Sequence, residues 1–388
     1  MGSKAIVRIA RIKDKEEIFN FISKNWKERS PYQIPERWEW LFIKNPFIIK
    51  NYIKLPLPIW IAKKNNQIVG HTAAMIVPLK LGKKIYTASW SINTLVLSEF
   101  RGESIGYNLQ KANQESAQIF MSLGMSKANR SIKHKLGGID GPPVFNYFLR
   151  QRWTIEKISN ALLKRLNMFN KFGDLIFIYI KKFKIIILLH YILNLPLKIR
   201  LLYYKIKNYT VLNKSGISIS EIERFADLLD KDLIGLMKPY KFAVNRTSEY
   251  LNWKFVDQPH LEYRIFLATK GENVLGYTII RVGQKPHENN NGIILELMAD
   301  LKDNKTMYYL LNHVLSIFTD AKTESSIIST SISEIEKVIK RFGYKKRSET
   351  IPVIYISDDI EEKKLFQDKT SWLFSYGDHD LDQFPNII

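Results

Sequence analysis

The sequence contains no cysteine and is short of acidic side chains. The absence of cysteine from its 388 residues excludes disulfide bonds, thiolate metal sites and a cysteine nucleophile. Its 38 Asp and Glu face 59 Lys and Arg, which leaves a formal net charge of +21. A protein this basic is expected to meet an anionic partner: a nucleic acid, a phosphate-bearing cofactor or a lipid surface. Because 45% of the residues are apolar, the chain can bury sizeable cores, and a mainly disordered state is excluded.

Long uncharged runs are absent as well. The run Ile185–Leu197 has 13 residues, whereas a helix that crosses a bilayer needs about 20. The charged string Lys13–Glu17 closely follows the short apolar stretch at the N-terminus, which argues against a signal peptide. We therefore expect a cytoplasmic bacterial protein.

Nearly half of the net charge lies in residues 161–216. This segment has eleven Lys or Arg and one acid, Asp174, for a net charge of +10. Most of its other residues are Ile, Leu, Phe and Tyr. A basic, apolar helix of this kind is typical of a helix that lies on an anionic membrane surface, which here is the inner face of the cytoplasmic membrane. The alternative is a linker whose apolar side packs against the domains on either side.

The regions flanking this segment repeat one another. The string ERWEWLFIKNP from Glu36 matches EYLNWKFVDQP from Glu249 in the spacing of Glu, Trp, Phe and Pro. Further on, WIAKKNNQIVGHT from Trp60 matches FLATKGENVLGYT from Phe266. Each of the latter strings predicts a hairpin, because two alternating apolar strands flank a polar turn. A duplicated unit of domain size explains the repeat.

Both halves continue in the same order. An apolar strand is predicted at Ser89–Leu97 and at Gly292–Met298, followed by a helix at about 105–122 and about 305–319. A short strand is then predicted at Ser126–Ile132 and Ser326–Thr330, followed by a helix and a final strand pair. We predict an α/β fold with mixed α+β sheets, divided into domains at 1–160 and 217–388 and joined by a helical linker at 161–216.

The most informative local string is LVLSEFRGESIGYNLQ. A strand runs into Arg101–Gly106, and a helix begins near Ile105. Glycines at a strand-to-helix turn let backbone N–H groups converge, and the helix N-terminus adds a partial positive charge. Arg101 can add a charge-assisted contact, and Gly106 lets a ligand approach the first helical turn. The turn therefore predicts a pyrophosphate site.

With these residues, the chain resembles the GNAT superfamily of N-acetyltransferases, in its tandem-domain form. The family's acetyl-CoA loop reads Arg/Gln-x-x-Gly-x-Gly/Ala; here Ser104 replaces the usual middle Gly, and Glu103 replaces a frequent Lys. The resemblance implies that acetyl-CoA or another acyl-CoA is the cofactor. The cofactor-binding residues that it implies are Leu95, Val96, Leu97, Arg101, Gly102, Glu103, Ser104, Ile105 and Gly106.

The resemblance also implies direct attack by an amine, which needs a base and an acid. The family's acid is commonly a Tyr in a helix that ends near Gly-Phe. In the second half, Ile339 takes that place before Gly343. In the first half, the string VFNYFLRQRW offers Tyr147 as the candidate acid, with a packing aromatic as the alternative. His71, after the hairpin glycine, is the candidate base, and it could equally be a structural histidine.

The second half lacks the glycine turn. No glycine occurs from Leu301 to Leu310, and Asp300 and Asp303 would repel a pyrophosphate. We expect a degenerate unit. The C-terminal SWLFSYGDHDLDQF alternates Asp378, Asp380 and Asp382, which we interpret as a solvated acidic tail; a cation site or a site for an amine substrate is the alternative.

Together these features predict an acyl-CoA-dependent N-acyltransferase, acting on the primary amine of a small molecule or an amino sugar. One alternative is an aminoacyltransferase of the peptidoglycan-bridge type, and another is a non-catalytic, membrane-associated protein with the same fold. No metal ion is expected. Nucleic acid is the least supported partner, because the basic segment is too apolar for a solvated phosphate-binding arm.

Overall fold

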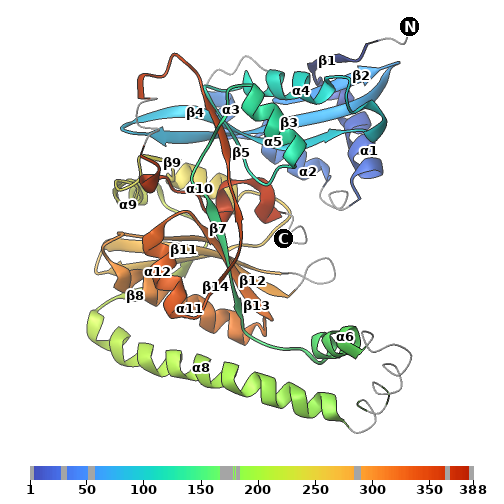
Figure 1. The fold of residues 1–388 in the computed structure, drawn as a ribbon. Helices are drawn as coiled ribbons and strands as arrows, with labels where there is room; N and C mark the ends of the chain where they lie inside the picture. Colours follow the sequence, from blue (N-terminus) through green and yellow to red (C-terminus); the bar gives the residue numbers. More distant parts are fainter. Residues whose placement is uncertain are drawn as a thin grey trace.

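Two mixed β-sheets form the frame of the protein, one above the other in Figure 1. The computed structural model describes residues 4–27, 33–50, 57–166, 178, 180, 184–283, 290–362 and 368–383. Lys171, Asp174, Lys181 and Lys182 of the basic segment lie outside these residues.

The first sheet has eight strands in the described part of the chain, in the order β1-β2-β3-β4-β5-β15-β6, with β9 paired to β3. These strands are β1 (Ile6–Ile9), β2 (Ile59–Lys64), β3 (Gln67–Leu81), β4 (Lys84–Val96), β5 (Ile119–Ser122), β6 (Ile139–Asp140), β9 (Phe242–Val244) and β15 (Val353–Ile356).

The second sheet has seven strands among the described residues, in the order β14-β7-β13-β12-β11-β10-β8. They are β7 (Val144–Arg150), β8 (Ser218–Ile222), β10 (Arg264–Lys270), β11 (Asn273–Val282), β12 (Asn291–Ala299), β13 (Ser325–Thr330) and β14 (Lys345–Thr350).

Helices cover the sheets and connect them. They are α1 (Lys15–Asn25), α2 (Pro35–Trp38), α3 (Pro46–Lys50), α4 (Ile105–Gln114), α5 (Lys127–Lys135), α6 (Ile155–Leu166), α8 (Ile185–Ser215), α9 (Asp230–Leu236), α10 (Ser248–Phe255), α11 (Asn304–Asp320) and α12 (Ser333–Arg341). The mixed α/β class predicted from the sequence is confirmed.

The two predicted hairpins are present and correspond residue by residue. Ala62 pairs with Gly70 in β2–β3, and Ala268 pairs with Gly276 in β10–β11; each pair is followed by a shift of register. Both turns have two residues, and Asn65 and Asn66 take the positive φ that such turns require. In both sheets the next strand joins antiparallel and the one after it joins parallel. This equal topology supports the interpretation of a duplicated unit.

The two halves exchange a strand. β7 follows the first half in sequence but lies between β13 and β14 of the second sheet, where Tyr147 is opposite Ile328. In return, β15 from the second half pairs with β5 of the first sheet. Figure 1 shows both strands running between the sheets. The sheets therefore do not follow the domain boundaries predicted at 160 and 217, because 144–150 and 353–356 each complete the sheet of the other half.

One short element was predicted wrongly. The stretch Ser126–Ile132 is not a strand but the start of α5, and Ser126 caps this helix by accepting a hydrogen bond from the N–H of Asn129. The strand in this part of the chain is β5, which lies inside the range 105–122 that was predicted to be helical. The helix observed there, α4, already ends at Gln114. A strand of four residues is too short to show a change from the helical to the strand periodicity of apolar residues, which explains the error.

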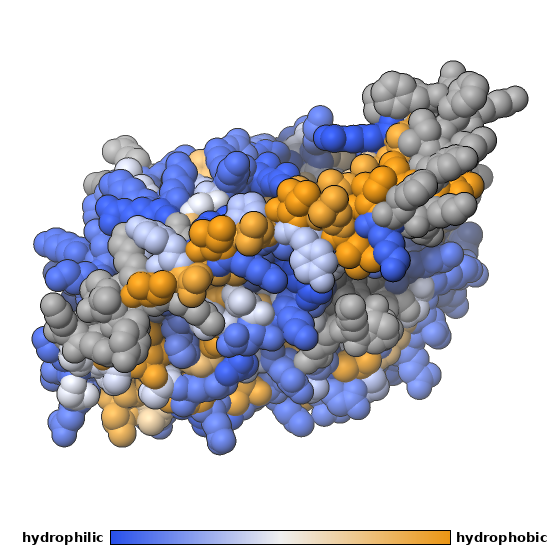
Figure 2. All heavy atoms as spheres, turned by 90° about the horizontal axis from the view of Figure 1, so that it is seen from below, coloured by the Kyte–Doolittle hydropathy of each residue, from blue (hydrophilic) through white to orange (hydrophobic). Residues whose placement is uncertain are grey.

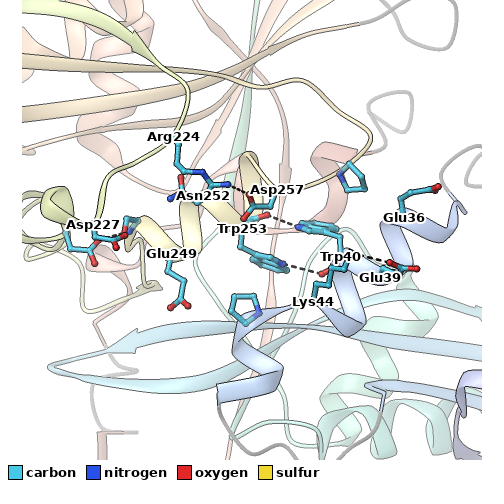
Figure 3. Close-up of a pocket in the computed structure, with 14 residues that line it drawn as sticks. Glu36, Glu39, Trp40, Lys44, Arg224, Asp227, Glu249, Asn252, Trp253 and Asp257 are labelled. Atoms are coloured by element: carbon cyan, nitrogen blue, oxygen red, sulfur yellow. Dashed lines mark hydrogen bonds and ion pairs between the residues drawn. The ribbon is translucent and has the colours of Figure 1, made fainter.

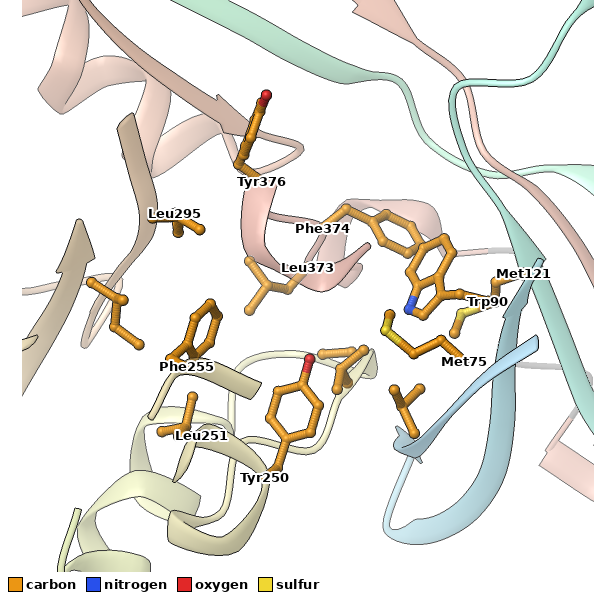
Figure 4. Close-up of a cluster of buried hydrophobic side chains, with 14 of the residues drawn as sticks. Met75, Trp90, Met121, Tyr250, Leu251, Phe255, Leu295, Leu373, Phe374 and Tyr376 are labelled. Carbon is orange, nitrogen blue, oxygen red and sulfur yellow. The ribbon is translucent and has the colours of Figure 1, made fainter. Parts of the chain in front are cut away.

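The C-terminal segment lies between the two halves instead of in solvent. Figure 4 shows Leu373, Phe374 and Tyr376 inserted between Trp90 of the first sheet and Phe255 of the second half. Asp378, Asp380 and Asp382 are at most 1% exposed, so the interpretation as a solvated acidic tail is wrong. Each has a cation partner from elsewhere in the chain, which stabilises the buried charges. The ion pairs are Asp378 with Arg246 at 2.8 Å, Asp382 with Lys254 at 3.0 Å and Asp380 with Arg37 at 3.6 Å.

Candidate active site

The two central strands of the first sheet separate and leave a free edge. β4 and β5 pair over only three residues, from Ala88 with Ile119 to Trp90 with Met121. β4 then continues to Val96 while β5 ends at Ser122. Asn93 has a φ of 52° at a bulge opposite β3, and a bulge of this kind bends its strand. The edge of β4 from Ile92 to Val96 therefore pairs with no described strand on the β5 side, and the Ser91 oxygen there contacts His379 instead.

His71 holds this bulge from behind. Its Nδ1 lies 2.8 Å from the carbonyl oxygen of Asn93, and the side chain is 2% exposed. Burial lowers the pKa of His71 to about 4, so the ring is neutral at pH 7. His71 is not among the described residues that line the cavity of the next paragraph. Its contacts place it as a support of β4, and the structure does not bring it together with the glycine turn.

A cavity of about 950 Å³ occupies the space between the separated strands. It is lined by β4, the glycine turn, the first residues of α4, the loop into α5 and the C-terminal segment. The described lining includes Arg101, Lys135 and His379 and no Asp or Glu, so the electrostatic potential favours an anion. The volume falls in the range of a site for a sizeable ligand, about 300–1,000 Å³.

Seven of the nine predicted cofactor residues line this cavity. They are Leu95, Val96, Arg101, Gly102, Ser104, Ile105 and Gly106. Leu97 and Glu103 are not among the lining residues. Both carboxylate oxygens of Glu103 accept hydrogen bonds from Lys64 Nζ at 2.8 Å, which pairs the acid that could have opposed a phosphate.

The exposed turn before α4 has the backbone geometry that favours an anion. The N-cap Ser104 has a φ of 59°, and Gly102 has a φ of 102°. These left-handed residues turn the chain so that the N-terminus of α4 faces the cavity, and the first N–H groups of a helix have no partner within it. A Cβ on Gly106 would lie 3.3 Å from Ile132 Cδ1, so larger side chains there would project into the cavity's wall. Arg101 is exposed beside the turn.

His379 is a buried lining residue of the cavity that no sequence pattern singled out. Its Nδ1 lies 2.7 Å from Asp380 Oδ1, and its Nε2 lies 3.3 Å from the carbonyl oxygen of Ser91 on the free edge of β4. The ring packs edge-on against Trp90 at 5.2 Å. If Nδ1 donates to Asp380, Nε2 is an acceptor. The Ser91 oxygen can only accept, so in the contact seen here Nε2 is the donor. With the proton on Nδ1 beside Asp380 instead, Nε2 and the Ser91 oxygen would both be acceptors for an amine.

Tyr147 lies in the second sheet and is not among the described residues lining the cavity. The strand exchange separates it from the glycine turn, and burial raises the pKa of its hydroxyl. The first-half counterpart of α12 is α5, since both end at a glycine of equal backbone conformation, Gly137 with φ 86° and Gly343 with φ 87°. By this correspondence, Lys133 stands where Ile339 stands in the second half.

Lys133 is connected to the wall of the cavity through Gln110 and Thr94. Its side chain is 2% exposed, with Nζ bonded to Gln110 and 4.3 Å from the centre of the Phe120 ring. Burial lowers the pKa of Lys133 well below its usual value. Gln110 in turn donates to Thr94 at 2.9 Å, so the lysine supports the separated part of β4. The helix-ending string Leu136-Gly137-Gly138 is the sequence signal that could have found this position.

A second cavity, of about 940 Å³, lies where the repeated motifs of the two halves meet. Trp40 and Trp253 stack there with ring centres 5.0 Å apart, and the indole N–H of each donates to the carbonyl oxygen of the other. Figure 3 shows Glu36 and Glu249 on either side of this pair. The reciprocal contact is what two copies of one unit would make about a local two-fold axis, and it joins the halves.

The left-handed conformation of Ser104 gives a first prediction. Glycine adopts this conformation without the steric cost that a Cβ brings, so Ser104→Gly should raise the free energy of unfolding by about 0.5–1 kcal/mol. Urea denaturation measures the change. Ser126→Gly is the matched control. Ser126 caps α5 and has an ordinary φ of −65°, so this substitution should lower the free energy of unfolding. An equal effect of both substitutions would contradict the assignment of strain to Ser104.

Comparison with protein-family models and with curated protein sequences finds no match. Solved structures are similar at the level of the fold. N-myristoyltransferase of Saccharomyces cerevisiae with bound myristoyl-CoA has a TM-score of 0.53 and 9% identity, over 92% of this chain and 80% of that one. A probable N-acyltransferase of Enterococcus faecalis has a TM-score of 0.52 and 10% identity, over 91% and 72%.

A GCN5-related N-acetyltransferase of Anabaena variabilis is also similar, with a TM-score of 0.52 and 8% identity, over 91% of this chain and 73% of that one. The matched fold spans both halves of the chain. The protein therefore has the fold of the GNAT superfamily of acyltransferases, as the sequence predicted.

Proposed function

We propose that the protein transfers an acyl group from acyl-CoA, with acetyl-CoA as the donor, to the primary amine of a small molecule or an amino sugar. The observation that carries this proposal is a single cavity whose lining includes the glycine turn before α4, the edge of β4 and His379 in contact with the Ser91 oxygen. The similar solved structures support the proposal at the level of the fold.

The residues present fit an acyl-CoA. The turn at Gly102–Gly106, with Arg101, would hold the pyrophosphate by backbone N–H groups and a guanidinium. The free edge of β4 at Ile92–Val96 offers alternating N–H and C=O groups to the amide groups of a pantetheine arm. When bound, acyl-CoA supplies a thioester with a carbonyl open to attack by an amine.

Residues of the chain accept and return the proton that the amine loses. An amine that replaces the hydrogen bond between His379 Nε2 and the Ser91 oxygen would donate to both atoms, with the ring proton on Nδ1 beside Asp380. Nε2 takes the proton that the nitrogen loses as the amide forms, and Asp380 stabilises the resulting imidazolium. The same imidazolium returns the proton to the sulfur that leaves, so His379 ends each cycle in its starting state.

Isothermal titration with acetyl-CoA tests the proposal. We expect the wild-type protein to bind acetyl-CoA. Arg101→Ala should bind at least tenfold more weakly, a loss of about 1.4 kcal/mol in binding free energy, because it lacks a charge-assisted contact. Gly106→Trp should bind more weakly still. Gly235→Trp is the matched control, since a Cβ on Gly235 of α9 meets no atom within 4 Å. No binding by the wild type, or equal binding by all variants, would reject the proposal. The aminoacyltransferase and non-catalytic alternatives predict that outcome.

A further inference from the structure

The long helix α8 presents a stripe of apolar side chains to solvent. Its 31 residues run along the outer side of the second half, beyond α11 and beside α6 (Figure 1). Large apolar residues on its outward face are each more than half exposed. They are Leu188 (59%), Tyr191 (64%), Ile192 (54%), Leu195 (58%), Ile199 (59%), Leu202 (57%), Tyr203 (56%) and Ile206 (59%).

These residues recur every three or four positions, so they form one continuous line on the helix instead of scattered contacts. From residue 188 to residue 206 the line is about 27 Å long at 1.5 Å per residue. Figure 2, viewed from below, shows an apolar band crossing this face between polar borders. A contiguous exposed apolar surface of this size is unusual for a soluble monomer and marks a binding surface.

Polar contacts on the opposite face fix how the helix is rotated. The side-chain amide of Asn194, 5% exposed, accepts from the N–H of Trp153 at 2.9 Å and donates to its carbonyl oxygen at 3.0 Å. Further along, Arg200 donates to the carbonyl oxygen of Arg150 at 2.6 Å. Because these bonds hold one face of α8 against the end of β7 in the second sheet, the apolar line cannot turn inward.

The charge of the helix selects the partner. No Asp or Glu occurs from Ile185 to Ser215 in the sequence, and exposed Lys184 and Lys198 border the apolar line. Lys164 and Arg165 are exposed on neighbouring α6. A helix that has exposed apolar side chains, bordering lysines and no acid complements a surface that is apolar inside and anionic at its border, which is the composition of an acidic bilayer interface.

We propose that α8 binds flat on an anionic phospholipid bilayer, the inner face of the cytoplasmic membrane, with its apolar line between the headgroups. The stretch Ile185–Tyr203, with a mean hydropathy of 1.7 over 19 residues, also has the length and composition of a helix that crosses a membrane. The contacts of Asn194 with Trp153 and of Arg200 with Arg150 oppose a crossing, because a spanning α8 would have to break them. The proposal does not depend on the proposed enzymatic activity.

Co-sedimentation of the full chain with vesicles tests the proposal. We expect the wild type to pellet with vesicles of phosphatidylcholine containing about 30 mol% phosphatidylglycerol, and to remain in the supernatant with phosphatidylcholine alone. Raising the salt from about 0.1 M to about 0.5 M NaCl should weaken the binding by screening. The triple variant L188Q/I192Q/L195Q should bind at least about tenfold more weakly, and K184Q/K198Q should reduce the salt dependence.

The matched control is I6Q/I12Q/L228Q, which removes three residues that are 68%, 70% and 80% exposed elsewhere and should bind as the wild type does. Unchanged thermal unfolding of each variant shows that it is folded. Equal binding by the helix variant and the control, or wild-type protein that stays in the supernatant with anionic vesicles, would overturn the proposal. A wild-type dimer in solution that the helix variant dissociates would also overturn it, since the apolar line would then pair two copies of the chain.

Discussion

His379→Ala is expected to lower kcat for acyl transfer by about 10²–10⁴-fold, because it removes the one imidazole among the described residues that line the cavity. The affinity for acetyl-CoA should change by less than about threefold, since the pyrophosphate site that we propose is formed by other residues, Gly102–Gly106. Steady-state kinetics with an amine acceptor and isothermal titration of acetyl-CoA measure the two quantities separately.

Two further variants separate chemistry from packing. His379→Gln keeps a polar side chain against Trp90 but cannot accept and return a proton, so it should be as inactive as His379→Ala. Asp380→Asn should lower kcat, since an amide stabilises a neighbouring imidazolium less than a carboxylate does. His313→Ala, in the second half on α11, is the control and should retain activity. Full activity of His379→Gln would show that the histidine only fills space.

The repeat could be predicted from the sequence because its signals are local. A hairpin is defined by about a dozen consecutive residues, so the alignment of Ala62 and Gly70 with Ala268 and Gly276 gave the correct register in both sheets. The glycine turn is local in the same way, and most of its residues line the cavity. Composition also showed where the charge lies, although not which face of α8 is exposed.

The misses depend on contacts between distant parts of the chain. Neighbouring strands usually pair with one another, which favoured keeping Val144–Arg150 in the first half. The structure instead pairs this strand with β13 and β14, nearly two hundred residues away. Tyr147 belongs to this strand, so the candidate acid lies in the second sheet and not beside the glycine turn. Alternating Asp residues near the end of a sequence are expected to be solvated unless cations pair with them. Arg246, the partner of Asp378, lies more than a hundred residues earlier, so the sequence does not show the pair.

Arg246→Met is expected to lower the free energy of unfolding by about 3–5 kcal/mol at neutral pH. Arg246 is 0% exposed and donates to Glu296 at 3.0 and 3.1 Å and to Asp378 at 2.8 Å. Without the guanidinium, two buried carboxylates would remain with no cation in this cluster. Urea denaturation measures the loss, and Lys346→Met, which breaks an exposed pair with Glu349, should cost less than about 0.5 kcal/mol.

The sign of the pH dependence distinguishes buried charge from simple loss of packing. Burial raises the pKa of Glu296 even with Arg246 present, and the substitution would raise it further. A carboxyl group whose pKa is higher in the folded state destabilises the protein above its unfolded pKa and is relieved as pH falls through its folded pKa. The deficit of Arg246→Met relative to wild type should therefore shrink on acidification. A deficit independent of pH would assign the loss to packing alone.

Because Asp378 precedes His379 directly, a folded variant that keeps acetyl-CoA binding but loses turnover would show that this ion pair also positions the proposed base.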